Sequence, residues 1–330
     1  MVESRKIPRQ AKVPVTLVYS DAYRIDLPAF ILDAFPFDVN KYQKIFNRLS
    51  SEGLLERVRL VEPKPLTEEQ LALVHTPEYI ATMAEPEQAA LTLELEAVLA
   101  LPKELIANVI QRFFLHAAGG TLEAACAAAE TGGIAINLGG GFHHAYPDHG
   151  SGFCMVADIP IATRYLLQHG SIGRILIVDC DLHQGDGNAT ILAGDSRVVT
   201  FSIHQEDNFP EPKAKSTLDI GLFSEPAVGD TLYLEMLKKH IPRLIKRYQP
   251  ELVFYLGGTD PYCEDELGGF QLSAEGILQR DLYVVDTVVG QHGLPLVMVL
   301  AGGYSARSWE LHFNSIRQIL VRYAAAPKTQ

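Results

Sequence analysis

Apolar residues along the chain fall into short continuous runs separated by longer amphipathic segments. The runs predict buried β-strands at residues 16–19, 57–61, 134–138, 174–178, 198–203, 252–256 and 295–300. Most of these runs are continuously apolar rather than alternating, as expected for strands that are covered on both faces. Apolar positions with helical spacing predict helices at residues 39–51, 104–131, 158–169, 230–247, 273–290 and 306–324. The alternation of strands and helices predicts an α/β fold with one open, largely parallel sheet.

Domain organisation follows from the evenness of this pattern. The 330 residues suffice for one large α/β domain or for two ordinary ones. No internal repeat, low-complexity tract or linker rich in Pro, Gly and Ser interrupts the chain. We therefore expect a single domain over residues 1–330, with its core at about 15–325.

Composition and charge narrow the classes of partner. The chain is 47% hydrophobic and 21% charged, which is typical of globular proteins. Its formal net charge of −12 argues against a broad nucleic-acid surface and against an anionic membrane as partner. There is no stretch of 18 apolar residues, so no membrane span is expected, and residues 1–16 lack the apolar core of a secretory signal. The four cysteines form no C-x-x-C pair, and for the three that lie in apolar runs we expect buried, reduced thiols in a cytoplasmic protein.

Glycines and chemically active residues follow four of the predicted strands. The segments are Gly-Gly-Gly-Phe-His-His at 139–144, Asp-Cys-Asp-Leu-His-Gln-Gly-Asp-Gly at 179–187, Gly-Gly-Thr-Asp at 257–260 and Ala-Gly-Gly-Tyr at 301–304. Open α/β sheets bind ligands at the carboxyl ends of their strands. The four segments are therefore expected to converge on one site.

The segment after the fourth predicted strand has the pattern of a metal site. Alternate residues of an extended segment point the same way, so Asp179, Asp181 and His183 can present two carboxylates and an imidazole together. Such ligands suit Zn²⁺ or a similar divalent ion, and Asp260 can supply a further ligand. If Asp181, His183 and Asp260 bind the ion, a position stays open for water, as in catalytic zinc sites. The alternative is that these polar residues cap helices or loops.

Two histidines and a tyrosine supply candidate proton-transfer groups. His143 and His144 beside a metal-bound water can act as general base and general acid. Asp179 and Asp186 are candidates to fix their tautomers. Tyr304 can donate a hydrogen bond to a developing oxyanion. Each residue alone would be explained by packing, and only their combination favours a catalytic role.

In combination, these motifs resemble the zinc-dependent histone deacetylase family. The segments at 36–38, 74–79 and 266–277 are most similar to class IV deacetylases and their bacterial relatives. The resemblance covers about 15–325, and it implies an arginase–deacetylase fold, a single parallel sheet of about eight strands flanked by helices. It also implies hydrolysis of Nε-acyl-lysine amides and suggests that long fatty-acyl groups are removed better than acetyl groups.

Carried over by position, the resemblance implies roles for individual residues. The implied zinc ligands are Asp181, His183 and Asp260. The implied catalytic group is His143, His144 and Tyr304, with Asp179 and Asp186 as the partners of the two histidines and His144 as the general base. The implied substrate tunnel involves Gly152, Phe153, Phe209 and Leu267. A structural monovalent cation, expected to be K⁺, is implied near Asp179, Asp181, His183, Ser202 and Ile203, and a second near Leu192, Asp195 and Val198.

The chain also departs from the family pattern. Phe35 stands where class IV relatives commonly have histidine, which affects the expected shape of the entrance loop. No residue matches the carboxylate with which class I enzymes hold a peptide backbone at the rim. The segment 205–222 is expected to be a short loop of acidic or neutral character.

Other functions remain open at this point. An acyl-polyamine or other small-molecule amidohydrolase would use the same chemistry, and the net charge of −12 suits a cationic substrate of either kind. An arginase-like ureohydrolase would need more carboxylates to bridge two Mn²⁺ ions. A non-catalytic acyl-lysine reader would be expected to have lost one of the chemical groups, all of which are present. The expected partner is an acyl-lysine protein or peptide, or an acylated small amine, and the oligomeric state is not predicted.

Overall fold

Eight parallel strands form one sheet in the computed structural model, which describes residues 11–326. In chain order the strands are β1 (Val15–Val18), β2 (Arg59–Val61), β3 (Ile134–Asn137), β4 (Ile175–Asp179), β5 (Val198–Gln205), β6 (Leu218–Leu222), β7 (Leu252–Leu256) and β8 (Leu296–Val299). Their order across the sheet is β2-β1-β3-β8-β7-β4-β5-β6, and every neighbouring pair is parallel. The predicted fold class, α/β with a single parallel sheet, is confirmed.

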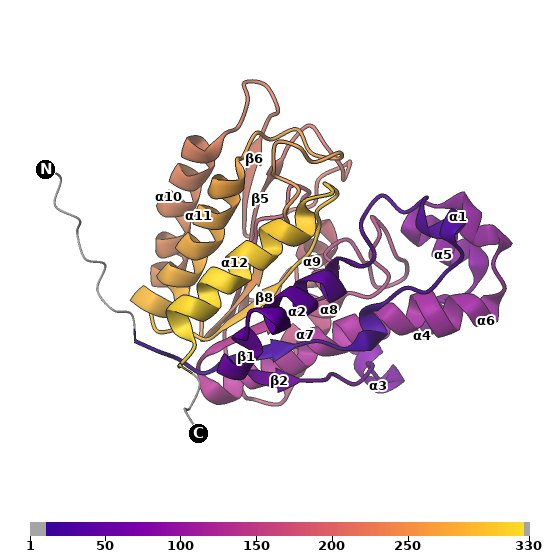
Figure 1. Ribbon diagram of the computed structural model, residues 1–330, viewed down its shortest axis with the longest axis horizontal. Coiled ribbons are helices and arrows are strands. Elements are labelled where there is room, and N and C mark those ends of the chain that lie inside the picture. The colour runs from indigo at the N-terminus through magenta and orange to yellow at the C-terminus, as the bar shows by residue number, and fades with distance from the viewer. Residues whose placement is uncertain (1–10, 327–330) are drawn as a thin grey trace, which may run out of the picture.

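Two groups of longer helices flank the sheet (Figure 1). The first group packs in the order α2 (Lys41–Ser51), α12 (Ser308–Tyr323), α11 (Ala274–Val285) and α10 (Asp230–Tyr248). The second contains α7 (Arg112–Thr131), which contacts β1, β3 and β8, with α8 (Asp158–Gln168) and α9 (Asp186–Ile191) beside it. Because both faces are covered, the central strands are buried along their whole length, as their apolar sequences predicted.

Short helical segments make up a lobe on the right of Figure 1. The short α-helices of the chain are α1 (Ala29–Leu32), α3 (Glu68–Leu71), α4 (Pro77–Thr82), α5 (Pro86–Leu93) and α6 (Lys103–Leu105). Single 3₁₀ turns lie at Asp21–Tyr23, Leu54–Arg57 and Glu96–Ala100. Thr76 and Thr67 cap α4 and α3 by accepting backbone N–H groups with their hydroxyls, which explains where these helices begin.

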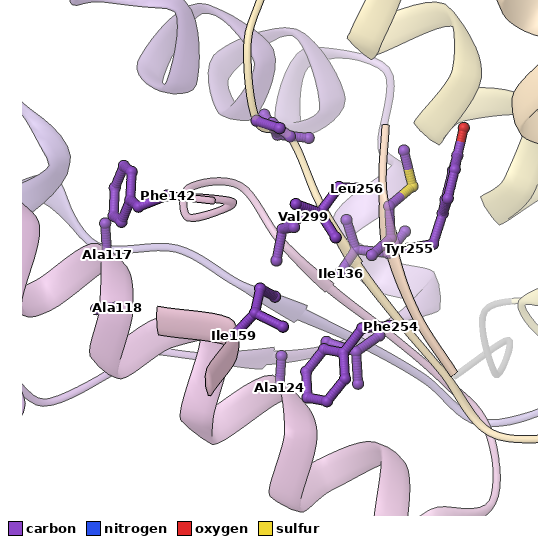
Figure 2. Close-up of a cluster of buried hydrophobic side chains, with 14 of the residues drawn as sticks. Ala117, Ala118, Ala124, Ile136, Phe142, Ile159, Phe254, Tyr255, Leu256 and Val299 are labelled. Atoms are coloured by element: carbon purple, nitrogen blue, oxygen red, sulfur yellow. The ribbon is translucent and has the colours of Figure 1, made fainter. Parts of the chain in front are cut away.

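Small side chains on α7 allow this helix to lie close to the sheet. Figure 2 shows Ala117, Ala118 and Ala124 of α7 in a cluster with Ile136 of β3 and Val299 of β8. All of these residues are buried. A helix with alanine on its inner face brings its backbone nearer to the strands than one with leucine. This contact positions the segment after β3, which carries the predicted catalytic histidines.

Several predicted elements are corrected by the structure. Strand β6 lies within the segment 205–222, expected to be a loop; it is a half-buried edge strand, so its sequence lacks a continuous apolar run. The predicted helix 104–131 contains a π-helical stretch at Ile106–Gln111, and the helix 273–290 becomes π-helical at Asp286–Gln291. Hydrophobic periodicity reports which face is buried, and it does not report which carbonyl each N–H group bonds.

The structure bears on two further expectations. Cys154 and Cys180 are buried as expected, whereas Cys126 is only partly buried and Cys263 is exposed. Among the described residues, no helix is long and apolar enough to cross a membrane. The expectation about an N-terminal signal concerns mainly residues 1–10, which lie outside the described part of the chain.

Candidate active site

The loops after β3, β4, β7 and β8 meet at the carboxyl edge of the sheet, because these strands are neighbours in its centre. The register of the ladders aligns Asp179, the last residue of β4, with Leu256 at the end of β7. The residues that follow each strand therefore emerge at the same level. This arrangement brings the predicted metal ligands and the predicted catalytic residues into one site.

Asp181, His183 and Asp260, the predicted metal ligands, lie together in a group that could hold a metal ion. All three are buried, and their candidate ligand atoms lie within 4.8 Å of one another. The Nδ1 atom of His183 is 3.1 Å from Oδ2 of Asp260 and 3.3 Å from Oδ1 of Asp181. Two carboxylates and one imidazole leave at least one position of a tetrahedral ion open.

Backbone groups fix the two carboxylates in place. Gly302 N–H donates to Oδ2 of Asp181 at 2.8 Å, and Leu182 N–H donates to Oδ1 of Asp260 at 2.9 Å. Glycine is required beside them, because a Cβ atom at Gly302 would lie 2.5 Å from Oδ2 of Asp260 and one at Gly258 would lie 2.3 Å from Oδ2 of Asp181. The glycines after β7 and β8 thus make room for the metal ligands.

The two buried carboxylates of this group are stabilised by a positive charge beside them. In the metal-free protein, burial and the charge of Asp181 raise the pKa of Asp260 to about 7. Burial opposes protonation of His183, but its hydrogen bonds to Asp181 and Asp260 raise its pKa to about 10. A proton on His183 thus offsets two buried carboxylates, and a divalent ion would replace that proton. The donor set and its charge fit Zn²⁺ or Fe²⁺.

His143 and His144 each hydrogen-bond one carboxylate, as predicted. Nδ1 of His143 is 2.8 Å from Oδ2 of Asp179, and Nδ1 of His144 is 2.6 Å from Oδ1 of Asp186. Without a metal, burial opposes the charge on His143 but Asp179 and Asp181 outweigh it and raise its pKa to about 9. Burial and the neighbouring charge of His143 lower the pKa of His144 to about 4. The two rings are therefore held in opposite protonation states.

An open pocket of about 340 Å³ leads from the surface to His144 and His183, and the four predicted tunnel residues line it. Its lining includes Gly152, Phe153, Phe209, Leu267 and Tyr304. The Phe209 ring lies 4.9 Å from the His144 ring, and the Tyr304 ring lies 6.0 Å from the His183 ring. Phe209 and Leu267 are 38% and 39% exposed, so they form the outer part of the wall.

Gly152 and Phe153 make the turn that shapes this wall. Both have positive φ angles, +50° and +64°. A Cβ atom at Gly152 would lie 2.6 Å from Cδ2 of His144, so only glycine allows the backbone of this turn to lie against the His144 ring. The strained Phe153 is held by a hydrogen bond from its N–H to the carbonyl of Thr92 at 2.9 Å.

A second, smaller pocket of about 40 Å³ is lined by both histidines and shares His144, Gly152, Phe153 and Tyr304 with the outer pocket. Its remaining wall is largely aromatic, with Phe37, Tyr42, Phe113, Phe114 and Phe142. Lys41 also lines it and donates from Nζ to the carbonyl of Ala301 at 3.0 Å. Burial lowers the pKa of Lys41, while the charges of Asp260 and Asp181 oppose this change.

The entrance loop with Phe35 is built from stacked rings. Phe35 is buried against Phe37 at 5.4 Å, and Phe37 lies 6.0 Å from Phe153. An apolar residue at position 35 therefore anchors the loop, which a histidine would do less well in an apolar setting. Glu94, an exposed residue with φ +52°, contributes a carboxylate to the lining of the outer pocket.

Two other carboxylates that sequence reasoning missed support the site. Asp265 accepts backbone N–H groups from Tyr304 at 2.8 Å and from Leu267 at 3.1 Å, so one side chain holds two pocket residues. Asp158 accepts the N–H groups of Gly141 and Phe142, just before the histidines, at 2.8 and 2.9 Å. Neither residue lies in a motif, and no sequence signal marked them.

Arg280 of α11 lies under the metal-binding loops. It is fully buried, and its Nη1 atom donates to the carbonyls of Cys180 at 3.1 Å and Gly258 at 2.6 Å. Nη2 donates to the carbonyl of Gly257 at 3.0 Å, and Nε donates to Asp281 at 2.8 Å. One guanidinium group thus connects the loop that carries Asp181 to the loop that carries Asp260.

Of the two segments implied to hold monovalent cations, the first includes Asp179 at the end of β4, and the second leads into the start of β5 at Val198. Asp179 is the register neighbour of Ser202 on β5, and the Ser202 hydroxyl is 2.9 Å from Nδ1 of His204. At the second segment, the carbonyls of Leu192 and Asp195 accept the N–H groups of Asp195 and Val198. Both cation sites stay predictions.

Comparison with known proteins identifies the class to which this chain belongs. Residues 35–319 match the histone deacetylase domain. The chain therefore belongs to the histone deacetylase family, as its motifs predicted, and it is a hydrolase that acts on acetylated substrates. The eight-stranded sheet agrees with the arginase–deacetylase fold that the resemblance implied.

Relatives in bacteria and plants cover most of the chain. It is 37% identical over 298 residues to an uncharacterized protein of Picosynechococcus sp., covering 90% of this chain and 95% of the relative. It is 33% identical over 306 residues to histone deacetylase 2 of Arabidopsis thaliana, covering 92% and 78%. It is 27% identical over 305 residues to the acetoin utilization protein AcuC of Staphylococcus aureus, covering 86% and 77%.

Proposed function

We propose that the protein hydrolyses Nε-acyl-lysine amides with one divalent metal ion, Zn²⁺ or Fe²⁺, held by Asp181, His183 and Asp260. The observation that carries the proposal is that a buried three-ligand group and two histidine–carboxylate pairs lie at the base of a pocket walled by aromatic rings. A pocket with apolar walls suits the aliphatic stem of lysine. The family supplies the reaction class, hydrolysis of an acylated substrate.

The bound ion would polarise the acyl carbonyl and lower the pKa of water from about 15.7 toward 7. His144 takes the proton of the attacking water at Nε2, because its Nδ1 is engaged by Asp186 and its pKa is low enough to leave the ring neutral. Asp186 then stabilises the imidazolium that forms.

Tyr304 stabilises the oxyanion that forms in the reaction, and His143 protonates the leaving amine. The Tyr304 hydroxyl donates to the acyl oxygen as negative charge develops there; burial raises its pKa well above 10, so it remains a donor. His143, which is protonated in the metal-free protein, donates its Nε2 proton to the leaving amine as the C–N bond breaks. The products are a carboxylate and a free amine.

The smaller pocket is the expected place of the acyl group, and its wall is largely aromatic, which suits an apolar group. The preference for long fatty-acyl chains that the class IV resemblance suggests stays a prediction.

The rim of the pocket supports a cationic substrate. Glu94 contributes a carboxylate to the outer pocket, and the net charge of −12 favours a lysine-rich peptide or an acylated polyamine over an anionic substrate. We place the peptide first because Phe209 and Leu267 offer an exposed apolar rim on which a chain can lie. We also propose that K⁺ near Asp179 and Ser202 has a structural role.

The test combines metal analysis with turnover of three substrates. Metal per chain is measured on purified protein, and hydrolysis is followed for an acetyl-lysine peptide, the same peptide with myristoyl-lysine, and acetylspermidine. His144→Ala is the inactive variant; His116→Ala, an α7 histidine whose Nδ1 bonds the carbonyl of Arg112 at 2.8 Å, is the matched control.

We expect one zinc or iron ion per chain, peptide turnover that His116→Ala retains, and loss of turnover in His144→Ala. Turnover of acetylspermidine alone would move the assignment to a small-molecule amidohydrolase. Two manganese ions per chain would indicate a ureohydrolase. A bound metal with peptide binding and no turnover would indicate an acyl-lysine reader.

A further inference from the structure

Tyr146 lies two residues after the catalytic histidines and contacts the carboxylate partner of one of them. Its hydroxyl donates to Oδ2 of Asp186 at 2.9 Å. The other oxygen of the same carboxylate, Oδ1, is the one that bonds Nδ1 of His144 at 2.6 Å. Tyr146, Asp186 and His144 therefore form a continuous hydrogen-bonded row that ends at the proposed general base.

The other histidine–carboxylate pair is held differently. Asp179 bonds His143 through Oδ2, and its Oδ1 accepts the backbone N–H of Asp181 at 3.1 Å. A main-chain group thus orients Asp179. For Asp186, the first residue of α9, the corresponding contact on the second oxygen comes from the Tyr146 side chain.

Local contacts hold the Tyr146 ring in this position. The ring stacks on that of His149 with centroids 4.7 Å apart and planes 8° apart. The N–H of Tyr146 donates to the carbonyl of His149 at 2.9 Å, and His149 bonds Asp148 at 2.8 Å. Burial and the charge of Asp186 raise the pKa of Tyr146 to about 12, so the hydroxyl keeps its proton at neutral pH.

We propose that Tyr146 is a positioning residue: its hydroxyl orients the Asp186 carboxylate and, through it, the His144 ring that takes the proton from water. The inference rests on the proposed function, in which His144 is the general base. Without the hydroxyl, the carboxylate can rotate about its Cβ–Cγ bond, and His144 spends less time in the reactive orientation. Tyr146 does not line either pocket, so substrate binding should not depend on it.

The test removes the hydroxyl and keeps the ring. In Tyr146→Phe we expect kcat for the acetyl-lysine peptide to fall about tenfold, the order seen for residues that orient a site from outside it, with KM and metal content unchanged. The matched control is Tyr165→Phe on α8, whose ring stacks on His169 at 4.0 Å in the same manner and should leave kcat unchanged. Unchanged kcat in Tyr146→Phe overturns the proposal.

A double-mutant cycle distinguishes positioning from a general structural effect. If Tyr146 acts through Asp186, then adding Tyr146→Phe to Asp186→Ala lowers kcat by less than twofold further. A second tenfold loss in that background means that Tyr146 does not act through the carboxylate, and it overturns the proposal.

A measurement that needs no turnover separates this inference from the proposed function. In protein with ¹⁵N-labelled histidine, the proton between Nδ1 of His144 and Asp186 is assigned by its loss in Asp186→Ala. Tyr146→Phe should shift this resonance, because the hydroxyl draws charge from the same carboxylate. If the wild-type protein is inactive but Tyr146→Phe still shifts this resonance, the proposed function is refuted and the positioning role stands. If the resonance does not shift in Tyr146→Phe, the positioning role is refuted.

Discussion

Replacing Arg280 by methionine tests how the two metal-binding loops are held. Methionine keeps much of the apolar volume of the side chain and removes the guanidinium group. The carbonyls of Gly257 and Gly258 then lose their charged donor, and Asp281 becomes a buried carboxylate without its cation. Two contacts remain: the Tyr233 hydroxyl still donates to Cys180 and the Tyr255 hydroxyl still donates to Asp281.

The expected loss of stability follows from the burial of the ion pair between Arg280 and Asp281. Both side chains are completely inaccessible to solvent, and removal of one partner of such a pair costs about 3–5 kcal/mol. Because the two tyrosine contacts remain, we expect the free energy of unfolding to fall by about 4 kcal/mol. For 330 residues, the unfolding entropy is about 0.7 kcal/mol/K, so this loss lowers Tm by about 6 °C.

The assay is equilibrium urea unfolding of the metal-free protein, with thermal unfolding alongside. Arg307→Met is the matched control: Arg307 is 47% exposed beside Glu310, so its loss should lower the free energy of unfolding far less than the loss of Arg280. The double variant Arg280→Met/Asp281→Asn should regain about 2 kcal/mol, because it removes the uncompensated charge while keeping an acceptor for Tyr255. Zinc should also dissociate faster from Arg280→Met, since the ligand loops are no longer joined.

The reasoning would be refuted if Arg280→Met lost about as little stability as Arg307→Met. It would also be refuted if the double variant were less stable than the single one, because the loss would then come from packing and not from the isolated charge.

Two further predictions concern the reaction and its pH range. Tyr304→Phe should lower kcat by about 10²–10³-fold with metal content unchanged, as for loss of one oxyanion donor, and a variant with normal kcat would contradict its role. His75 accepts the N–H of Ala157 at 3.0 Å, and burial lowers its pKa to about 4, below the unfolded value of about 6.5. Protonation therefore favours the unfolded chain, and stability is lost as the pH falls from about 6.5 toward 4, by about 2 kcal/mol between pH 7 and 5. His75→Gln, which can still accept that N–H, should lose this part of the pH dependence in urea unfolding; an unchanged difference between pH 7 and 5 would exclude His75 as its source.

The convergence of Asp181, His183, Asp260 and the two histidines could be predicted because their positions depend on local rules. Alternation along an extended segment places Asp181 and His183 on one side, and a parallel sheet brings strand ends together whatever their separation in sequence. Asp260 lies 77 residues after His183, yet it was predicted from its place after a strand.

The supporting residues could not be predicted, because their contacts depend on how helices and loops pack. Arg280 reaches a carbonyl 100 residues away, and its position on a helix gives no sign of which loops lie opposite. Tyr146 stands next to a predicted motif, but its partner depends on the path of the loop to His149. Glu94 reaches the pocket because its own backbone lies in the left-handed region, and hydrophobic periodicity does not predict such a conformation.

The place of β8 in the sheet has a consequence for synthesis on the ribosome. This strand is the last in the described part of the chain, yet it lies between β3 and β7 in the centre of the sheet. While a nascent chain lacks residues 296–299, β2-β1-β3 and β7-β4-β5-β6 are separate half-sheets with unpaired inner edges. The half that holds Asp181, His183 and Asp260 can therefore join the half that ends in His143 and His144 only once β8 has emerged. Until then, the exposed strand edges are where a chaperone would be needed.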